Sequence, residues 1–335
     1  MITLVTGGTG LVGSNIIKLL LEQNRNVRVL VRSIARGQKL LPKECKLVEG
    51  DIRDIDSIRK AMKGCSIVYH AAGFPEQWMK DDAIFKRINT EGTRNMVKVA
   101  LEYQVKRFIY TSTIDVFEGK MNKKFDESII DPLPKKTAYE RSKQEADKIV
   151  TEFLSKGLPV IFLHPAAVYG PGPSSSEGVN GMIRKIYDSE LPALLPGGMP
   201  FVLAEDVAKG HLLAEKKASV GERFILSETY YSLREFVGLV LEIEKMPLKF
   251  PFTIPYPIAK IIAIIGEAIA KLTRRAPLVQ KGQLIFLQWQ SIPNSNKAIK
   301  QLNWSPTPIK EGLIKTITYL KNKSSLLERN DLDEK

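Results

Sequence analysis

A tyrosine and a lysine four residues apart, in the stretch Tyr139-Glu-Arg-Ser-Lys143, form a pair suited to proton transfer. On a helix these positions share one face, so the Lys143 ammonium is expected near the Tyr139 phenol, where it would favour the ionised form. A free phenol has a pKa near ~10, and lowering it to neutrality requires about 4 kcal/mol of differential stabilisation. One lysine rarely supplies that much, and a cationic cofactor nearby would supply part of the rest. Alone, this spacing also occurs by chance in a Tyr and a Lys exposed on a helix, and it indicates a proton donor beside a cofactor only together with the motif that precedes it.

The N-terminal stretch Thr6-Gly-Gly-Thr-Gly-Leu-Val-Gly13 has the glycine spacing of a dinucleotide-binding turn. Met1–Thr6 is apolar and β-prone, and apolar residues recur at helical spacing after the glycines, which predicts strand, tight turn and helix. Gly7 and Gly10 would let the backbone approach a pyrophosphate whose charge is met by amides at the helix N-terminus, while Gly13 would let helix and strand pack closely. We therefore expect a dinucleotide at this turn.

The expected second strand, Val27–Val31, is followed by Arg32. Dinucleotide folds that prefer NAD usually place an acid here on the adenosine ribose, whereas Arg32, with Arg36, would pair with a 2′-phosphate. This residue favours NADP, with NAD as the alternative if Arg32 is only a solvated arginine at a strand end.

Composition excludes several other classes of protein. The 335 residues carry a formal net charge of +13, but the lysines are spread along the chain among acids, which predicts a solvated basic surface and no nucleic-acid partner. Cys45 and Cys65 have neither metal nor disulfide spacing, and the three histidines are scattered, so no metal site is expected. The first strand begins at once and leaves no room for a cleaved signal, so cytoplasm is the expected compartment.

Strands and helices alternate along the first half of the chain. This pattern predicts an α/β fold, a doubly wound parallel sheet (Rossmann fold) with right-handed crossovers and a smaller C-terminal substrate-binding part. We expect a dinucleotide-binding domain over 1–172, a mainly substrate-binding part over 173–320 with strands returning to the sheet, and a charged, fraying tail over 321–335. Further strands are predicted at Cys45–Glu49, Ser66–Ala72, Lys106–Ser112 and Pro159–Leu163, and helices at Asp56–Met62, Asn89–Tyr103 and Ala138–Lys156.

A set of short motifs resembles the extended branch of the short-chain dehydrogenase/reductase family over nearly the whole chain. Each motif is weak singly, and their joint order and spacing are specific. The closest resemblance is to dihydroflavonol reductases and 3β-hydroxysteroid dehydrogenases within the NAD-dependent epimerase/dehydratase superfamily. Besides the glycine turn and the Tyr-Lys pair, the motifs are Gly50-Asp51, His70-Ala-Ala-Gly73, Asn89-Thr-Glu-Gly-Thr93, Tyr110-Thr-Ser-Thr113 and His164-Pro-Ala-Ala-Val-Tyr-Gly-Pro-Gly172.

The resemblance implies roles for individual residues. Thr113, with Ser112 as the second choice, would hydrogen-bond the substrate oxygen; Tyr139 would exchange its proton; and Lys143 would lower the phenol pKa and hold the nicotinamide ribose. Asn89 would help to seat the cofactor. The other expected cofactor contacts are Gly7, Thr9, Gly10, Leu11 and Val12 at the glycine turn, Asp51 and Ile52 at adenine, Ala71, Ala72 and Gly73 along the cofactor, and Pro165 to Val168 beside the nicotinamide.

The same branch contains dehydratases, epimerases and reductases. Dehydratases follow their catalytic Thr with an Asp-Glu pair, whereas Ile114-Asp115 follows Thr113 here, and an isoleucine cannot transfer a proton. We therefore expect an NADP-linked enzyme that interconverts a ketone and a secondary alcohol on a moderately apolar molecule. An epimerase with bound NAD and a non-catalytic NADP-responsive binding protein are the alternatives, and a homodimer is common among similar proteins.

Three segments in the second half of the chain have a predicted structure. The segment Pro171–Gly178 is predicted to be a loop, and Asp206 is predicted to cap a helix that runs to about Ala218. The apolar segment Pro257–Leu272 is shorter than the ~20 residues that span a bilayer. We expect a core or pocket-wall helix there, with peripheral membrane contact or a hydrophobic entry to the site as the alternative.

Overall fold

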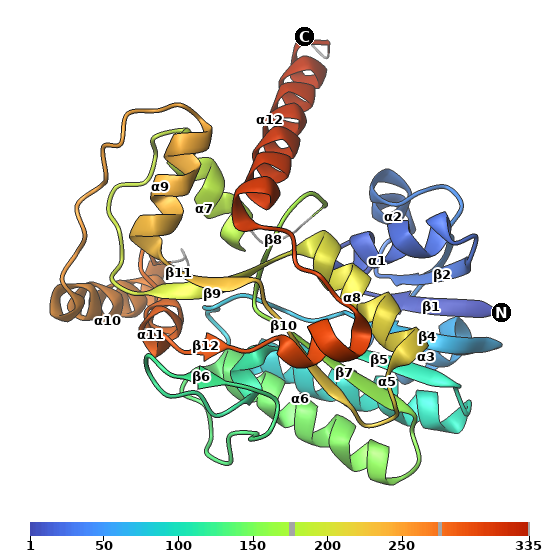
Figure 1. Cartoon of the computed structure of the whole chain (residues 1–335). Helices are drawn as coiled ribbons and strands as arrows, with labels where there is room; N and C mark the ends of the chain where they lie inside the picture. The colour runs from blue at the N-terminus through green and yellow to red at the C-terminus, as the bar shows by residue number, and fades with distance from the viewer. Residues whose placement is uncertain (174–177, 274–276, 334–335) are drawn as a thin grey trace.

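A parallel sheet of seven strands runs through the centre of the molecule (Figure 1). The structure is a computed structural model that describes residues 1–173, 178–273 and 277–333. The strand order is β10-β7-β5-β4-β1-β2-β3, and every neighbouring pair is parallel, which confirms the doubly wound α/β fold. The strands are β1 (Ile2–Thr6), β2 (Asn26–Val31), β3 (Lys46–Glu49), β4 (Cys65–His70), β5 (Arg107–Thr111), β7 (Val160–Pro165) and β10 (Arg223–Leu226).

Helices cover both faces of this sheet because successive strand residues point to opposite sides. Val5, Val29 and Tyr69 belong to one buried cluster, whereas their neighbours Leu4 and Leu30 belong to the other. On the first side pack α1 (Leu11–Glu22) and α8 (Ala204–Lys217), and on the second α3 (Ile55–Met62), α5 (Gly92–Glu102) and α6 (Ala138–Ser155). The short helices α2 (Ile34–Leu40), α4 (Ala83–Phe85), η1 (Lys86–Glu91) and η2 (Ile114–Val116) lie in the connections between these elements.

Much of the C-terminal half packs around a third buried cluster, beside the sheet (Figure 1). Strands β8 (Ala167–Tyr169), β9 (Gly198–Leu203) and β11 (Thr229–Ser232) make a small sheet that packs with α7 (Gly178–Tyr187), α9 (Leu233–Ile243) and α12 (Ile309–Asp333). Strand β10 and helix α8 return to the large sheet. The remaining elements are β6 (Lys124–Phe125), which pairs with β12 (Ile292–Pro293), α10 (Tyr256–Thr273), α11 (Lys281–Trp289) and η3 (Ala298–Leu302).

The strand order places the chemistry-bearing segments at one edge. Strand β1 lies between β4 and β2. From β1 the strand order runs through β2 to β3 on one side and through β4 to β5 on the other, so β1 and β4 flank the point where the strand order reverses direction. The carboxyl ends of β1, β4 and β5 lie together at this switch point. In open parallel sheets, ligands bind in the crevice at such a point. The glycine turn after β1 and the residues after β5 therefore face the same region.

The expected cap at Asp206 is wrong. Helix α8 begins at Ala204 with Leu203 as its N-cap residue and has no side-chain cap. Asp206 lies inside the first turn and is buried, and its carboxylate accepts hydrogen bonds from Thr307 N at 2.6 Å and Thr307 Oγ1 at 3.1 Å. Its backbone oxygen accepts from Trp304 Nε1 at 2.8 Å. Asp206 therefore fixes the segment that leads into α12.

Two further expectations concern the second half. The charged tail expected from Lys321 is helical as far as Asp333, because α12 continues through it and the residues after Gly312 include neither Gly nor Pro to end the helix. Pro257–Leu272 is helical as part of α10, but its large side chains are exposed, so it is not a core helix. Of the predicted loop Pro171–Gly178, residues 174–177 lie outside the described residues.

Candidate active site

The turn between β1 and α1 has the geometry of a pyrophosphate cradle. Gly7 has φ +73°, and a Cβ atom there would lie 2.6 Å from the backbone carbon of Ala71. A Cβ atom on Gly13 would lie 2.3 Å from Gly7 O. Only glycine at position 13 therefore lets α1 pack this closely against the turn. Gly10 is the N-cap residue and has no capping side chain, which leaves the first amides of α1 free to meet an anion. Thr9 lies in this turn, and Leu11 and Val12 begin α1.

The end of β2 carries an unpaired arginine. Arg32 is exposed and, among the described residues, has no hydrogen bond or ion pair. The nearby acid, Asp51, is bound by Arg53, with Nε to Oδ1 at 3.0 Å and the second nitrogen to Oδ2 at 2.8 Å. This hydrogen-bonded partner holds the Asp51 pKa below its usual value, and Arg32 adds a smaller effect of the same sign. Arg32 therefore presents a positive charge that forms no ion pair within the described part of the chain.

The segment Ala71–Gly73 after β4 is fixed by buried polar groups. Asn89, which is 2% exposed, accepts a hydrogen bond from Phe74 N at 2.7 Å and donates to Ser142 Oγ at 2.9 Å. Asn89 thus ties the loop to α6 and would act on a cofactor by holding this loop. Ile52 is 8% exposed and packs in the core, where a Cβ atom on Gly92 would lie 2.6 Å from its Cδ1.

Tyr139 is held in the first turn of α6 by the sequence around it. Thr137 and Glu140 form a capping box, in which Thr137 Oγ1 accepts from Glu140 N at 3.0 Å and Glu140 Oε2 accepts from Thr137 N at 3.0 Å. The Phe85 ring meets the Tyr139 ring edge-on, with centroids 6.4 Å apart. Burial and the charges of Asp115 and Glu140 raise the phenol pKa, while the Thr113 hydroxyl lowers it. Thr113 and Tyr139 therefore lie together.

Lys143 does not lie where helical spacing alone suggested. Its Nζ donates to Thr111 O at 3.0 Å and lies 5.2 Å from the centre of the Tyr110 ring, and no hydrogen bond joins it to Tyr139, although the structure describes both residues. Burial lowers the Lys143 pKa from 10.5 to about 8, against the opposing effects of Asp147 and Asp115. The expected lowering of the phenol pKa by this lysine is not seen in this arrangement.

Of the two hydroxyls after β5, only Thr113 faces the tyrosine. Ser112 Oγ donates to Asp147 Oδ2 at 2.7 Å, and the other oxygen of Asp147 pairs with Arg223 at 2.8 Å. Ser112 is therefore engaged in a buried ion pair that joins β5, α6 and β10. This geometry favours Thr113 over Ser112 as the hydroxyl that meets a substrate.

Sequence reasoning assigned no role to Asp115, and the structure places this residue in the site. Asp115 is 6% exposed, its Oδ2 accepts the Thr113 hydroxyl proton at 2.9 Å, and its Oδ1 is buried without a partner among the described residues. Burial and the Glu140 charge raise its pKa to about 7, against the opposing effects of Thr113, Lys135 and Lys143. Its position two residues after Thr113 was the available signal, but burial is not visible in sequence.

The remaining predicted contacts follow β7. Pro165 is the last residue of β7 in the large sheet, and Val168 lies in β8 of the small sheet. The two residues therefore lie where the chain passes from the large sheet to the small one. Within β7, His164 Nδ1 is 3.0 Å from Thr113 O, and this contact ties β7 to the segment that carries Thr113. Among the described residues, no cluster of three or more His, Cys, Asp or Glu side chains is arranged to hold a metal ion.

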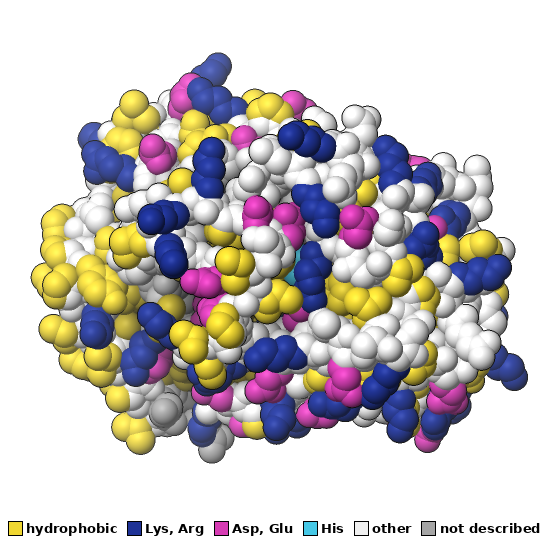
Figure 2. Space-filling view, turned by 60° about the horizontal axis from the view of Figure 1, so that its bottom comes forward, with side chains coloured by type: hydrophobic (Ala, Val, Ile, Leu, Met, Phe, Trp, Pro, Cys, Tyr) yellow, Lys and Arg dark blue, Asp and Glu magenta, His cyan; other side chains and the backbone are white. Residues whose placement is uncertain are grey.

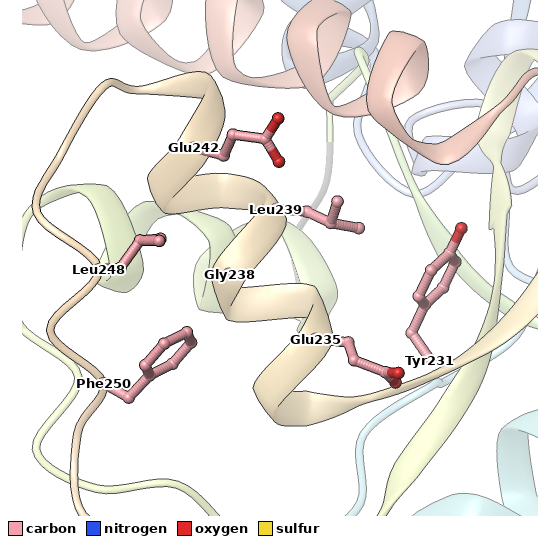
Figure 3. A pocket seen from close by; sticks show the side chains of 7 residues that line it. All are labelled: Tyr231, Glu235, Gly238, Leu239, Glu242, Leu248 and Phe250. Atoms are coloured by element: carbon pink, nitrogen blue, oxygen red, sulfur yellow. The ribbon is translucent and has the colours of Figure 1, made fainter.

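A cavity of about 420 Å³ lies elsewhere, between α9 and the loop that follows it. Leu248 and Phe250 of the loop face α9, as Figure 3 shows. None of the lining residues belongs to the predicted site, so this cavity is separate from the Tyr139 cluster. They are Tyr231, Glu235, Gly238, Leu239, Glu242, Leu248 and Phe250.

Comparison with known proteins agrees with this geometry. Residues 3–226 match the NAD dependent epimerase/dehydratase family. A putative dihydroflavonol 4-reductase from Synechocystis is 29% identical, over 95% of this chain and 94% of that protein. Sterol demethylase protein B from Methylococcus capsulatus is 26% identical, over 97% of this chain and 100% of that protein. The crystal structure of gox2253 superposes with a TM-score of 0.81 at 27% identity, over 96% of this chain and 98% of that one.

The chain belongs to the NAD dependent epimerase/dehydratase family. It is an enzyme of the extended short-chain dehydrogenase/reductase type, as its motifs predicted.

Proposed function

We propose that this enzyme interconverts a ketone and a secondary alcohol on a moderately apolar substrate, with NADP as the cofactor and Tyr139 as the proton donor and acceptor. The observation that carries the proposal is the convergence of Thr113 and Tyr139 beside the switch point that also holds the glycine cradle. The word sterol in the name of one relative denotes a largely apolar compound, which supports the substrate class.

Each residue of the proposed site has its own role in the reaction. Thr113 would donate a hydrogen bond to the substrate oxygen, and Tyr139 would give that oxygen its proton during reduction and take it back during oxidation. The bound nicotinamide would supply or accept the hydride. The raised phenol pKa keeps Tyr139 protonated at neutral pH, which suits it as the acid of the reductive direction. The cradle amides, the Ala71–Gly73 loop and Lys143 would hold the cofactor in place.

Asp115 gives the proposed reduction a pH dependence. Its pKa of about 7 means that the carboxyl is mostly protonated below that pH and ionised above it. The ionised carboxylate accepts a hydrogen bond from the Thr113 hydroxyl, as observed. The protonated carboxyl can instead donate a hydrogen bond to Thr113 Oγ1, which leaves the Thr113 hydroxyl free to donate its hydrogen bond to the substrate oxygen. We therefore expect the rate of carbonyl reduction by the unmodified enzyme to fall as the pH rises through about 7.

The substitution Asp115→Asn tests this dependence, because an amide can donate to Thr113 at every pH. The variant should lose the fall near neutrality in kcat/KM for reduction. It should also unfold at a higher temperature above neutral pH, because the raised pKa means that ionised Asp115 opposes folding there. Asp126→Asn, at a surface turn, is the matched control. Parallel pH profiles for the Asp115 variant and the parent would exclude this role.

Arg32 is proposed to select NADP through its 2′-phosphate. Arg32→Ala should weaken NADPH binding by about ten- to a hundredfold, because a charge-assisted contact is lost, and should change NADH binding much less. Titration of each cofactor by fluorescence measures both affinities. Lys39→Ala, which removes an exposed cation from the end of helix α2 that follows Arg32 in the chain, is the control. Comparable losses for NADPH and NADH would refute the phosphate contact.

An epimerase with bound NAD is the second candidate, because the family includes epimerases. Such an enzyme returns the same hydride and has no need to exchange its cofactor. Denaturing the purified protein and identifying what it releases separates the two. Exchangeable NADP supports the reductase, whereas one tightly retained NAD per chain supports the epimerase.

A cytoplasmic location is part of the proposal. Cys45 and Cys65 are both free and buried, which fits a reducing compartment. A homodimer stays an expectation from the resemblance.

A further inference from the structure

Helix α10 packs with its small residues inward and its large apolar residues outward. Ala259, Ala263 and Ala270 are 0–2% exposed on the side that meets the rest of the protein. The opposite side carries six aliphatic residues at helical spacing, between 36% and 85% exposed, which we call the isoleucine face: Ile258, Ile261, Ile262, Ile265, Ile269 and Leu272. A helix on the surface of a soluble protein usually turns its large apolar residues toward the core and its polar residues toward the solvent.

The apolar surface continues on both sides of the helix. Leu248 and Phe252 before α10 are 63% and 71% exposed, and Leu278 after it is 96% exposed. Apolar side chains gather at the left edge of Figure 2, the side on which α10 lies in Figure 1. Contiguous exposed apolar surface of this kind marks a site that binds a partner or a membrane.

The charges around this surface identify the partner. The segment from Lys245 to Lys281 contains one acid, Glu267, whose carboxylate binds Lys281 through the side chain at 3.3 Å and the backbone N at 2.8 Å. An isologous dimer through this face would bring two such basic segments together, whereas anionic lipid headgroups would neutralise them. The seven basic residues in the sequence of this segment are Lys245, Lys249, Lys260, Lys271, Arg274, Arg275 and Lys281.

The helix is suited to lie on a bilayer and not to cross it. At 18 residues it is about 27 Å long, with Lys260 and Glu267 within it. Within the described ranges, no helix combines the length and the apolar character that a membrane span requires. An apolar face bordered by basic residues is the pattern of helices that lie in the plane of the interface.

We propose that the enzyme binds an anionic lipid surface through α10, with the isoleucine face inserted among the headgroups and the exposed side chains of Lys249 and Lys260 against lipid phosphates. This contact does not depend on the proposed reaction. It would bring the enzyme to the phase in which an apolar substrate accumulates.

Vesicle sedimentation with the full-length protein tests this contact. Vesicles of phosphatidylcholine alone are compared with vesicles that contain about 30% phosphatidylglycerol, to which the protein should bind much more strongly, with binding weakened by salt. The triple variant Ile261→Gln, Ile265→Gln and Leu272→Gln should lower the partition constant at least about tenfold, because three apolar anchors are lost.

A second triple variant serves as the matched control. Met121→Gln, Leu133→Gln and Val220→Gln change side chains that are 49–69% exposed and lie outside α10, and should leave binding unchanged. Absence of parent binding to the anionic vesicles, or equal binding by parent and α10 variant, would overturn the proposal. It would also be overturned if the α10 substitutions instead dissociated an oligomer of lipid-free protein, because the face would then bind a second copy.

Discussion

Replacing Tyr139 by phenylalanine is expected to lower the rate of hydride transfer by about 10²–10⁴-fold, because the proton donor is lost. The ring stays against Phe85, and the capping box of Thr137 and Glu140 does not involve the phenol, so α6 should form as before. NADPH binding should stay nearly intact. Single-turnover oxidation of NADPH and a binding titration measure the two effects separately.

Tyr103→Phe is the control for this substitution, since it removes a phenol hydroxyl at the end of α5, away from the site. That variant should turn over like the parent. Equal turnover in Tyr139→Phe and the parent would remove Tyr139 from the mechanism.

Replacing Lys143 by methionine is expected to lower the turnover without lowering the thermal stability. The ammonium is 8% exposed, and its lowered pKa of about 8 shows that burial disfavours the charged form. A buried charge that burial disfavours opposes folding at neutral pH, so Lys143→Met should keep or raise the melting temperature despite the lost bond to Thr111 O. Turnover should fall by at least about a hundredfold, because the group proposed to hold the cofactor ribose is gone.

Lys148→Met changes an exposed lysine on the same helix and should affect neither quantity. A Lys143 variant that melts far below the parent would show that the ammonium is mainly structural. Retained turnover would show that it is not needed for the reaction. In the parent, activity that depends on the ammonium should decline as the pH rises through about 8, because the proton is then lost.

The sheet, and the proximity of Thr113 and Tyr139 at its edge, were predictable because both depend on local patterns. Alternating strands and helices fix a parallel sheet with its carboxyl ends at one edge, and this edge brings the glycine turn near Thr113. The capping box around Thr137 and Glu140 places Tyr139 at the start of α6. These features need no knowledge of distant contacts.

Features that depend on the direction of a side chain or on burial were not predictable. The spacing of Tyr139 and Lys143 gives a shared helix face, but the long lysine side chain reaches to the backbone of Thr111. The sequence around Asp115 does not show that its carboxyl is enclosed. Likewise, the pattern of α10 shows two faces, and only packing reveals that the alanine face turns inward.

We propose that the enzyme carries out net NADP-linked reduction or oxidation, with Tyr139 as the acid and the base. The direct test incubates the purified enzyme with NADPH and a panel of apolar ketones, and follows NADPH absorbance and alcohol product together, with Tyr139→Phe alongside. We expect NADPH to be consumed in equal amount to the alcohol formed, and the Tyr139→Phe variant to form almost none. Isomerised product with no net change in NADPH, from an enzyme that retains NAD, would contradict it.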